Sequence, residues 1–159
     1  MAEEQAAAED KRLAIVKIYV KDLSLESPRS PDIFRSKEWS PQTNLNLRTT
    51  HTAGDDNFHE VVLTISVEAK AKDDDRVLFL IELQQAGLFD MRGYSQEEFG
   101  VLVGSFCPNI LFPYARETIA SLVQKAGFPE FVLQPLNFDA LYTQSLEQQK
   151  SQAAQTEAH

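Results

Sequence analysis

The fold is decided by residues 59–70, which read HEVVLTISVEAK. Every second residue from Val61 to Ala69 is apolar, and polar side chains such as Glu60 and Thr64 stand between them. Side chains alternate between the two faces of a β-strand, so this period of two is typical of a strand with one face in a core. The stretch therefore predicts a strand whose odd-numbered residues point inward and whose even-numbered residues point to solvent.

The residues after this stretch predict a β-hairpin. An acidic turn at residues 72–75 leads to a strand that begins at Val77, again with its odd-numbered residues inward. An antiparallel sheet of this kind keeps one face in water, as the even-numbered polar residues require. Residues 87–93, which begin and end with glycine, predict a flexible connection after the hairpin.

The residues before the stretch predict two further strands. Residues 13–26 alternate, and residues 43–48 predict a short, weak strand. Between them, Pro28 and Pro31 block regular structure. By parity, one side of the first strand carries Ile15, Tyr19, Leu23 and Leu25, and the other side carries Asp22, Ser24 and Glu26.

Helical signals follow Pro108. Residues 96–103 predict a short helix, and a long helix is predicted to open within residues 107–117, with Pro113 in its first turn, and to end at Gly127. Its apolar stripe consists of Ala115, Ile119, Leu122, Val123 and Ala126.

A shorter C-terminal helix is predicted to start at Asn137 or Asp139, since both residue types cap helices well. One face of it carries Phe138, Leu141, Tyr142, Ser145 and Leu146. The order of strands followed by helices predicts an α+β fold, in which a four-stranded antiparallel sheet is covered on one face by the long and the shorter helix.

Composition sets the domain boundaries and excludes some partners. Residues 12–146 suit a single domain, whereas residues 1–11 predict a disordered acidic segment and residues 147–159 a flexible tail. The net charge of −9 repels nucleic acid and anionic lipid. The single cysteine forms no disulfide within the chain, and no apolar run suits a leader or a membrane span, so we expect a cytoplasmic protein without direct membrane insertion.

Residue types arranged for chemistry are missing from the sequence. The three histidines and Cys107 lack the spacing of a metal site, and the glycines match no phosphate-binding motif. Gly100 and Gly104 indicate close packing instead. Cys107 has no neighbouring base and reads as a buried structural thiol. We therefore expect no enzyme activity, no catalytic residue, no metal and no cofactor.

Three sequence strings carry a resemblance to a known family. They are CPNILFPYARE at residues 107–117, LIELQQ at residues 80–85 and PLNFDAL at residues 135–141, preceded by Asp22 and Glu26. Together they resemble the SecB protein-export chaperone family, and the match runs in order over residues 15–146. Ala86 departs from the family pattern, which has a second glycine there, and this affects only the local turn.

The resemblance implies an ATP-independent chaperone, assembled as a homotetramer that is a dimer of dimers. Such a chaperone binds unfolded preproteins, keeps them competent for translocation and delivers them to the SecA ATPase. In the family, the zinc-containing C-terminal region of SecA binds an acidic outer sheet surface. The matching positions in this sequence are Asp22, Glu26, Leu80 and Glu82.

The resemblance also implies apolar grooves for clients and interfaces for assembly. The groove candidates are Phe34, Trp39, Phe138, Leu141 and Tyr142, although core packing is an equal alternative for Phe138 and Leu141. The candidates for the oligomer interface are Ile81, Leu83, Gln85, Ile119, Leu122 and Val123, for which burial inside one subunit is the alternative.

Two other classes of function remain open from the residues alone. An adaptor that binds folded proteins through the acidic sheet face would ignore unfolded chains. A hydrolase is the weaker alternative, because it needs a nucleophile paired with a base and Cys107 is its best candidate.

Overall fold

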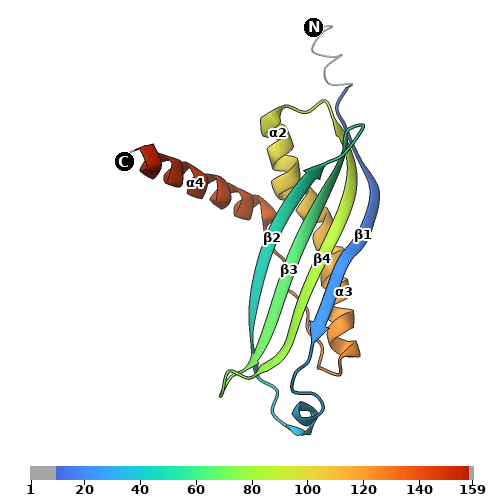
Figure 1. Cartoon of the computed structure of the whole chain (residues 1–159), viewed down its shortest axis with the longest axis vertical. Coiled ribbons are helices and arrows are strands. Elements are labelled where there is room, and N and C mark those ends of the chain that lie inside the picture. The colour runs from blue at the N-terminus through green and yellow to red at the C-terminus, as the bar shows by residue number, and fades with distance from the viewer. Residues whose placement is uncertain (1–9, 158–159) are drawn as a thin grey trace.

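Four antiparallel strands form a single sheet with the order β1-β4-β3-β2 (Figure 1). The computed structural model describes residues 10–157, so the predicted disorder of residues 1–9 and the last two tail residues lie outside the described residues. The strands are β1 (Arg12–Glu26), β2 (Pro41–Ala53), β3 (Phe58–Ala71) and β4 (Val77–Arg92). This architecture confirms the predicted α+β class; assembly into a dimer of dimers stays a prediction.

β3 is the central strand that its alternation predicted. It pairs with β2 along its whole length and with β4, and its odd-numbered residues from Val61 to Ala69 are fully buried. They pack beneath the helices together with Phe79, Ile81 and Leu83 of β4. The core thus lies between the helix-facing side of the sheet and the helical layer.

β1 departs from simple alternation, and one side-chain prediction is wrong for that reason. Its pairing with β4 shifts register between Ile15 and Lys17 and again between Val20 and Asp22. Each bulge inserts one residue and exchanges the two faces. Tyr19 therefore lies on the outer face, where its hydroxyl donates a hydrogen bond to Glu60, and not beside Ile15 as parity predicted.

β2 and β4 are longer than the sequence predicted. β2 spans 13 residues although only residues 43–48 alternate, because its backbone pairs with β3 without a break. β4 continues through residues 87–92, which were predicted to form a flexible connection. Gly87 is needed inside this strand, since a Cβ there would approach the Phe89 ring to 2.6 Å and Leu111 of the helical layer to 3.0 Å.

The helical layer is a continuous run over residues 96–125 rather than two separate helices. α2 (Gln96–Val101) passes through a π-helical turn, Leu102–Phe106, into α3 (Cys107–Lys125). Pro113 therefore lies inside α3 and not in its first turn. Gly127 ends the run as predicted, with a φ of 94° in the left-handed region that glycine tolerates.

α4 (Phe138–Glu157) begins as predicted, because the Asn137 side chain accepts a hydrogen bond of 3.0 Å from the Ala140 amide. Its 20 residues make it longer than the 19-residue α3, although it was expected to be shorter. It leaves the helical layer and extends past the β2 edge (Figure 1). The predicted flexible tail is helical up to Glu157, since alanine and glutamine favour helices, yet its described side chains are all exposed.

Candidate functional site

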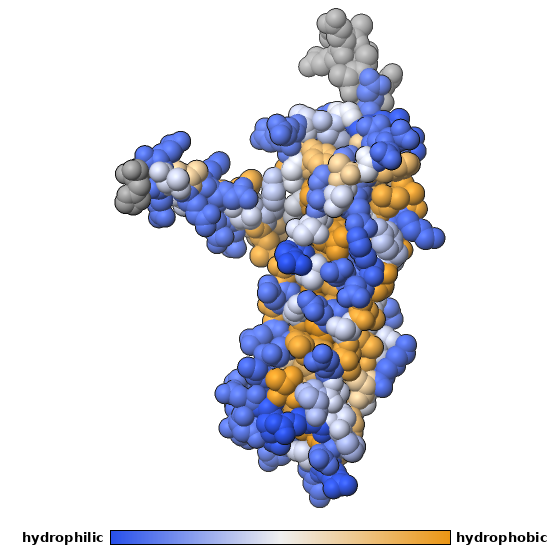
Figure 2. Space-filling view, in the orientation of Figure 1, coloured by the Kyte–Doolittle hydropathy of each residue, from blue (hydrophilic) through white to orange (hydrophobic). Residues whose placement is uncertain are grey.

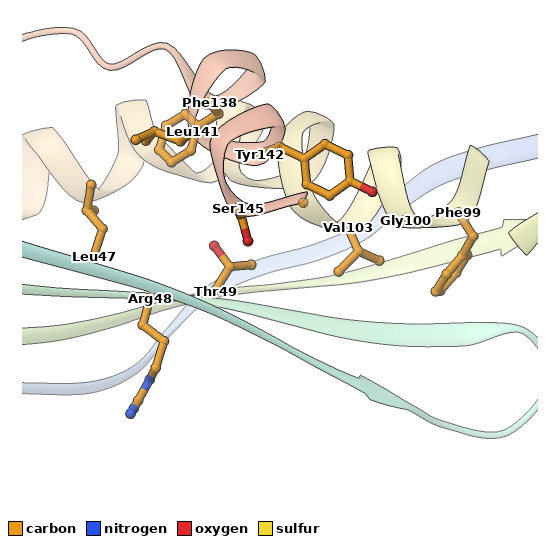
Figure 3. Close-up of a pocket in the computed structure, with 11 residues that line it drawn as sticks. Leu47, Arg48, Thr49, Phe99, Gly100, Val103, Phe138, Leu141, Tyr142 and Ser145 are labelled. Carbon is orange, nitrogen blue, oxygen red and sulfur yellow. The ribbon is translucent and has the colours of Figure 1, made fainter. Parts of the chain in front are cut away.

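An apolar hollow of about 720 Å³ lies between β2, the α2 end of the helical layer and α4. We call it the β2–α4 groove. Figure 3 shows Leu47 and Thr49 of β2 on one side and Leu141 and Tyr142 of α4 on the other, whereas Arg48 points away from it. Its apolar lining consists of Leu47, Phe99, Val103, Phe138, Leu141 and Tyr142.

Two glycines position Tyr142 in this groove. A Cβ at Gly104 would collide with the Tyr142 ring, and one at Gly100 would lie 2.8 Å from its hydroxyl oxygen. The ring thus rests directly on the backbone of the helical layer, which confirms that the glycine pair serves close packing. Ser105 in the π-helical turn also donates a hydrogen bond to Asp139 at the start of α4.

The predicted groove residues on α4 have different roles. Phe138 is buried, and its ring lies 5.5 Å from that of Phe112 on α3, so it anchors α4 to the core. Leu141 is 42% exposed although it lines the groove. Core packing and groove lining were equal alternatives for Phe138 and Leu141. Phe138 packs in the core, and Leu141 presents apolar surface to solvent.

Phe34 and Trp39 lie at a different place. Phe34 belongs to the short 3-10 helix η1 (Asp32–Arg35), and both rings lie 5.5 Å from that of buried Phe128, just beyond α3. Trp39 borders a second hollow of about 270 Å³ together with Ile33 and Leu78. The five predicted groove residues therefore fall into two sites. Phe138, Leu141 and Tyr142 lie at the β2–α4 groove, beside Leu47 in the middle of β2, and Phe34 and Trp39 lie near the start of β2.

The acidic residues predicted for partner binding lie together on the outer face of the sheet. Asp22 pairs with Gln84, Glu82 with Ser24, and Glu26 with Leu80, so all of them share the side away from the helices. Asp22, Glu26, Leu80 and Glu82 are all exposed. Figure 2 shows this face, where hydrophilic side chains are interspersed with apolar ones.

The sequence missed Glu68 as a member of this face. Glu68 pairs with Leu80 across β3 and β4, which extends the row that Glu26 begins. Lys70 forms an ion pair with it at 3.4 Å. The alternation had placed Glu68 on the outward side of β3, so the missing information was the register between strands. In the same way, Phe99, Val103 and Thr49 of the groove lacked a sequence signal because helix and strand meet only in the fold.

The residues predicted for the oligomer interface are mostly enclosed by their own chain. Ile81, Leu83, Ile119 and Val123 are fully buried, Gln85 is nearly so, and only Leu122 is half-buried. Gln85 donates a hydrogen bond of 3.2 Å to the Tyr19 carbonyl. Burial within one chain is thus observed for these five residues, and their part in a contact between copies stays a prediction.

A different surface leaves large apolar side chains uncovered. On the helix-facing side of β1, Ile15, Val20 and Leu23 are between 38% and 50% exposed, and Tyr114 of α3 is 52% exposed. Val20, Tyr114 and Pro113 border a shallow hollow of about 430 Å³. We call this the β1–α3 surface. β1 is also an edge strand, so one side of its backbone has no pairing partner within residues 10–157.

The remaining candidates for chemistry do not form a reactive site. Cys107 is buried, and burial raises the pKa of its thiol to about 12, so the nucleophilic thiolate is scarce at neutral pH. Within residues 10–157, no three metal-ligating side chains come together. No helix of this described part is long and apolar enough to cross a membrane.

Comparison with known proteins gives consistent matches over nearly the whole chain. The family model described as "Preprotein translocase subunit SecB" matches residues 5–149. The chain is 51% identical to the protein-export protein SecB of Nitrosococcus oceani over 93% of this chain and 90% of that protein. It is 48% identical to the protein of the same name from Hahella chejuensis, covering 97% of this chain and 95% of that protein.

A solved structure shares the fold. A SecB-like chaperone from Mycobacterium tuberculosis, in complex with a peptide from an antitoxin, superposes with a TM-score of 0.67. The match covers 84% of this chain and 95% of that chain at 18% sequence identity. The four-stranded sheet with its helical layer is therefore an arrangement that an experimental structure also has.

Proposed function

This chain belongs to the SecB family of preprotein translocase subunits, and we propose that it captures unfolded preproteins in the β2–α4 groove and passes them to SecA across the outer sheet face. Members of this family are chaperones of protein export and not enzymes, so the chaperone role of this chain follows from its membership. The observation that carries the site is the β2–α4 groove itself, with exposed Leu141 opposite Leu47.

The groove suits an unfolded client because its lining is apolar and open. Each apolar client side chain that becomes fully buried contributes about 1.5–3 kcal/mol before the cost of ordering the chain. Burial of this kind has no directional requirement, so many different sequences fit. This property matches a chaperone that accepts unfolded chains in general.

The second hollow, beside Trp39, extends the proposed path of the client. Trp39 stands two residues before β2, and Leu47 stands in the middle of the strand. Eight residues of extended chain span about 26 Å at 3.3 Å per residue. A client segment of similar length that runs along β2 would therefore contact both hollows, and Phe34, Trp39 and Phe128 would form its second apolar contact.

The outer face supplies the proposed docking surface for the zinc-containing C-terminal region of SecA. Glu26 pairs with Leu80, which is 36% exposed, Glu82 follows it on the same face of β4, and Asp22 lies further along this face opposite Gln84. Exposed ion pairs each contribute about 0–1 kcal/mol, so several must act together. The contact should therefore weaken as salt increases.

The β1–α3 surface supports the proposed assembly into a homotetramer that is a dimer of dimers. Ile15, Val20 and Leu23 are uncovered along one side of β1, and Tyr114 borders the same hollow as Val20, as expected for a contact between copies of the chain. Several grooves on one assembly would act on a single client and raise its avidity by about 10²–10⁴ over one groove. We place this work in the cytoplasm, where preproteins are still unfolded before export.

Light scattering from an aggregating, chemically unfolded preprotein tests the function. We expect the protein to suppress scattering without ATP, in proportion to its concentration, whereas Leu141→Glu suppresses it less. Val132→Glu is the matched control, because Val132 is similarly exposed but lies outside the groove. Undiminished scattering with the wild-type protein would overturn the proposal and favour an adaptor for folded proteins.

A further inference from the structure

The histidines of β2 and β3 form a pair that neither the fold nor the proposed function requires. His51 Nε2 and His59 Nδ1 lie 2.9 Å apart in a hydrogen bond, and the two rings stack with centroids 5.1 Å apart. Both residues lie on the helix-facing side of the sheet, near the turn that joins the two strands. The pair thus marks the end of the sheet that α2 covers (Figure 1).

Phe99 connects this pair to the helical layer. Its ring lies 4.8 Å from the His59 ring and 5.1 Å from the His51 ring, edge-on to both. Phe99 also lines the β2–α4 groove. The three rings therefore join α2 to the β2–β3 hairpin at the point where the wall of the groove begins.

We propose that His51, His59 and Phe99 form a proton-sensitive clasp, which holds α2 on the sheet at neutral pH and releases it in mild acid. The sensitivity to protons comes from the hydrogen bond between the His51 and His59 rings. A neutral imidazole has one donor and one acceptor nitrogen, whereas a protonated imidazole has two donors. The His51–His59 bond survives with one proton to share, but after both rings are protonated two N–H groups and two positive charges face each other.

The surroundings favour the neutral pair. Burial, followed by the proximity of His59, lowers the pKa of His51 below its usual 6.5. Burial also lowers the pKa of His59, although the carboxylate of Asp90 on β4 opposes this effect. Arg12 and Arg92 both pair with Asp90 Oδ2, at 3.3 and 2.9 Å, so two positive charges partly offset the carboxylate that faces His59.

The charges on α2 are engaged elsewhere. Glu98 pairs with Lys11 at 2.7 Å and bonds the Ser95 backbone in the helix cap, and Glu97 is exposed in the same first turn. α2 itself meets the histidines through the apolar ring of Phe99. The pair therefore has no carboxylate from α2 directly bonded to it within the described residues.

The sign of the pH effect follows from these directions. A histidine whose pKa is lowered in the folded state binds fewer protons there than in the open state, so the clasp is at full strength above pH 6.5 and weakens as the pH falls below it. Each pKa unit of difference corresponds to about a tenfold change in the opening equilibrium.

Hydrogen exchange of the full chain at pH 7.5 and pH 5.5 tests the clasp, after correction for the intrinsic pH dependence of exchange. We expect the amides of residues 96–101 to lose protection in acid, by up to about tenfold for each histidine at pH 5.5, while the β3 amides stay protected. NMR titration of the two histidines should show both pKa values below the usual 6.5. Equal protection of α2 at the two pH values would overturn the proposal, as would ordinary pKa values for the pair.

Two variants separate a clasp from a general effect of acid. His51→Gln with His59→Gln replaces both rings by neutral hydrogen-bonding side chains that do not titrate, so α2 protection should become nearly independent of pH. His159→Gln is the matched control and should retain the wild-type acid response. If the double variant proves too unstable, His59→Gln alone should weaken the acid response, because only His51 still titrates; an undiminished acid response in either folded variant contradicts the clasp. The test involves no client, so its failure leaves the proposed function untouched.

Discussion

The contact of Tyr142 with Gly100 and Gly104 shows, at the residue scale, how glycines help to form a site. The absence of a Cβ at Gly100 and Gly104 lets its ring lie against the helical layer, and this contact places α4 so that Leu141 stands over the groove. The sequence predicted close packing at these glycines but not its partner, because nothing in a local pattern specifies a residue 38 positions from Gly104 and 42 from Gly100 along the chain. A long-range contact of this kind becomes visible only when the two helices meet.

We predict that Gly104→Ala destabilises the protein by about 1–3 kcal/mol, since the added methyl group overpacks the interface with the Tyr142 ring. Gly100→Ala should cost less, because its methyl group meets only the hydroxyl end of a flexible side chain. Urea unfolding measures both changes. Tyr142→Phe removes the hydroxyl group, so in that variant Gly100→Ala should lower the unfolding free energy by less, whereas Gly104→Ala should lower it as much as before. If Gly100→Ala lowered it equally with and without the hydroxyl group, its methyl group would not be in contact with Tyr142.

The carboxylates of Asp22 and Glu26 lie on the predicted outer face of β1 although the strand contains two bulges. The first bulge in β1 exchanges its faces and the second restores them, so parity is right for Leu13 and Ile15 and again from Asp22 onward. Only the segment between the bulges, which contains Tyr19, is reversed. Bulges leave no clear trace in the alternation of a single strand, because their cause lies in pairing with the neighbour.

At the scale of the element, the strongest patterns were predicted best. β3 has both periodic alternation and full burial, and its predicted bounds differ from the observed ones by one residue at each end. β2 lacks alternation because its side chains are mainly polar and exposed, so its length comes from backbone pairing with β3 and not from its own sequence. Gly87 likewise suggested a loop, although the approach of α3 requires a glycine within β4.

Removal of residues 147–159 should leave the fold unchanged. The described side chains of this segment are exposed and α4 is anchored through Phe138 and Tyr142, so we expect a change in unfolding free energy within about 0.5 kcal/mol. Urea unfolding and circular dichroism would measure stability and the loss of helix. Truncation before residue 138, which removes Phe138 from the core, is the contrasting variant and should lower stability by several times that amount.

At the scale of the whole molecule, two surfaces lie on opposite sides of one sheet. The β2–α4 groove lies on the helical side, and Asp22, Glu26 and Glu82 lie on the outer side. The family resemblance predicted which residues belong to each function, whereas the separation into faces follows from the register. For positions such as Ile81 and Ile119 the sequence left core and interface open; both are buried within the chain, and their part in assembly stays a prediction.

Neutralising the outer face should impair SecA docking alone. We predict that Asp22→Asn with Glu82→Gln reduces affinity for SecA at low salt, with a smaller difference at high salt, because screening already weakens exposed charges. Affinity for an unfolded preprotein should stay within twofold of wild type, a difference of about 0.4 kcal/mol. Calorimetry measures both affinities.

Asp55→Asn with Asp56→Asn is the matched control, because it removes two charges from an exposed turn. It should leave both affinities near the wild-type values. A parallel loss of preprotein and SecA binding in the Asp22 and Glu82 variant would mean that the two surfaces are not independent.

The most direct test of the account is the affinity of Leu141→Glu for an unfolded preprotein, measured by calorimetry beside Val132→Glu. A carboxylate in the apolar groove removes a hydrophobic contact and must itself be desolvated, so we predict at least about a tenfold loss of affinity, or about 1.4 kcal/mol. Val132→Glu, on the exposed loop before α4, should bind as the wild type does. Wild-type affinity in Leu141→Glu, with the fold intact, would contradict capture in the β2–α4 groove.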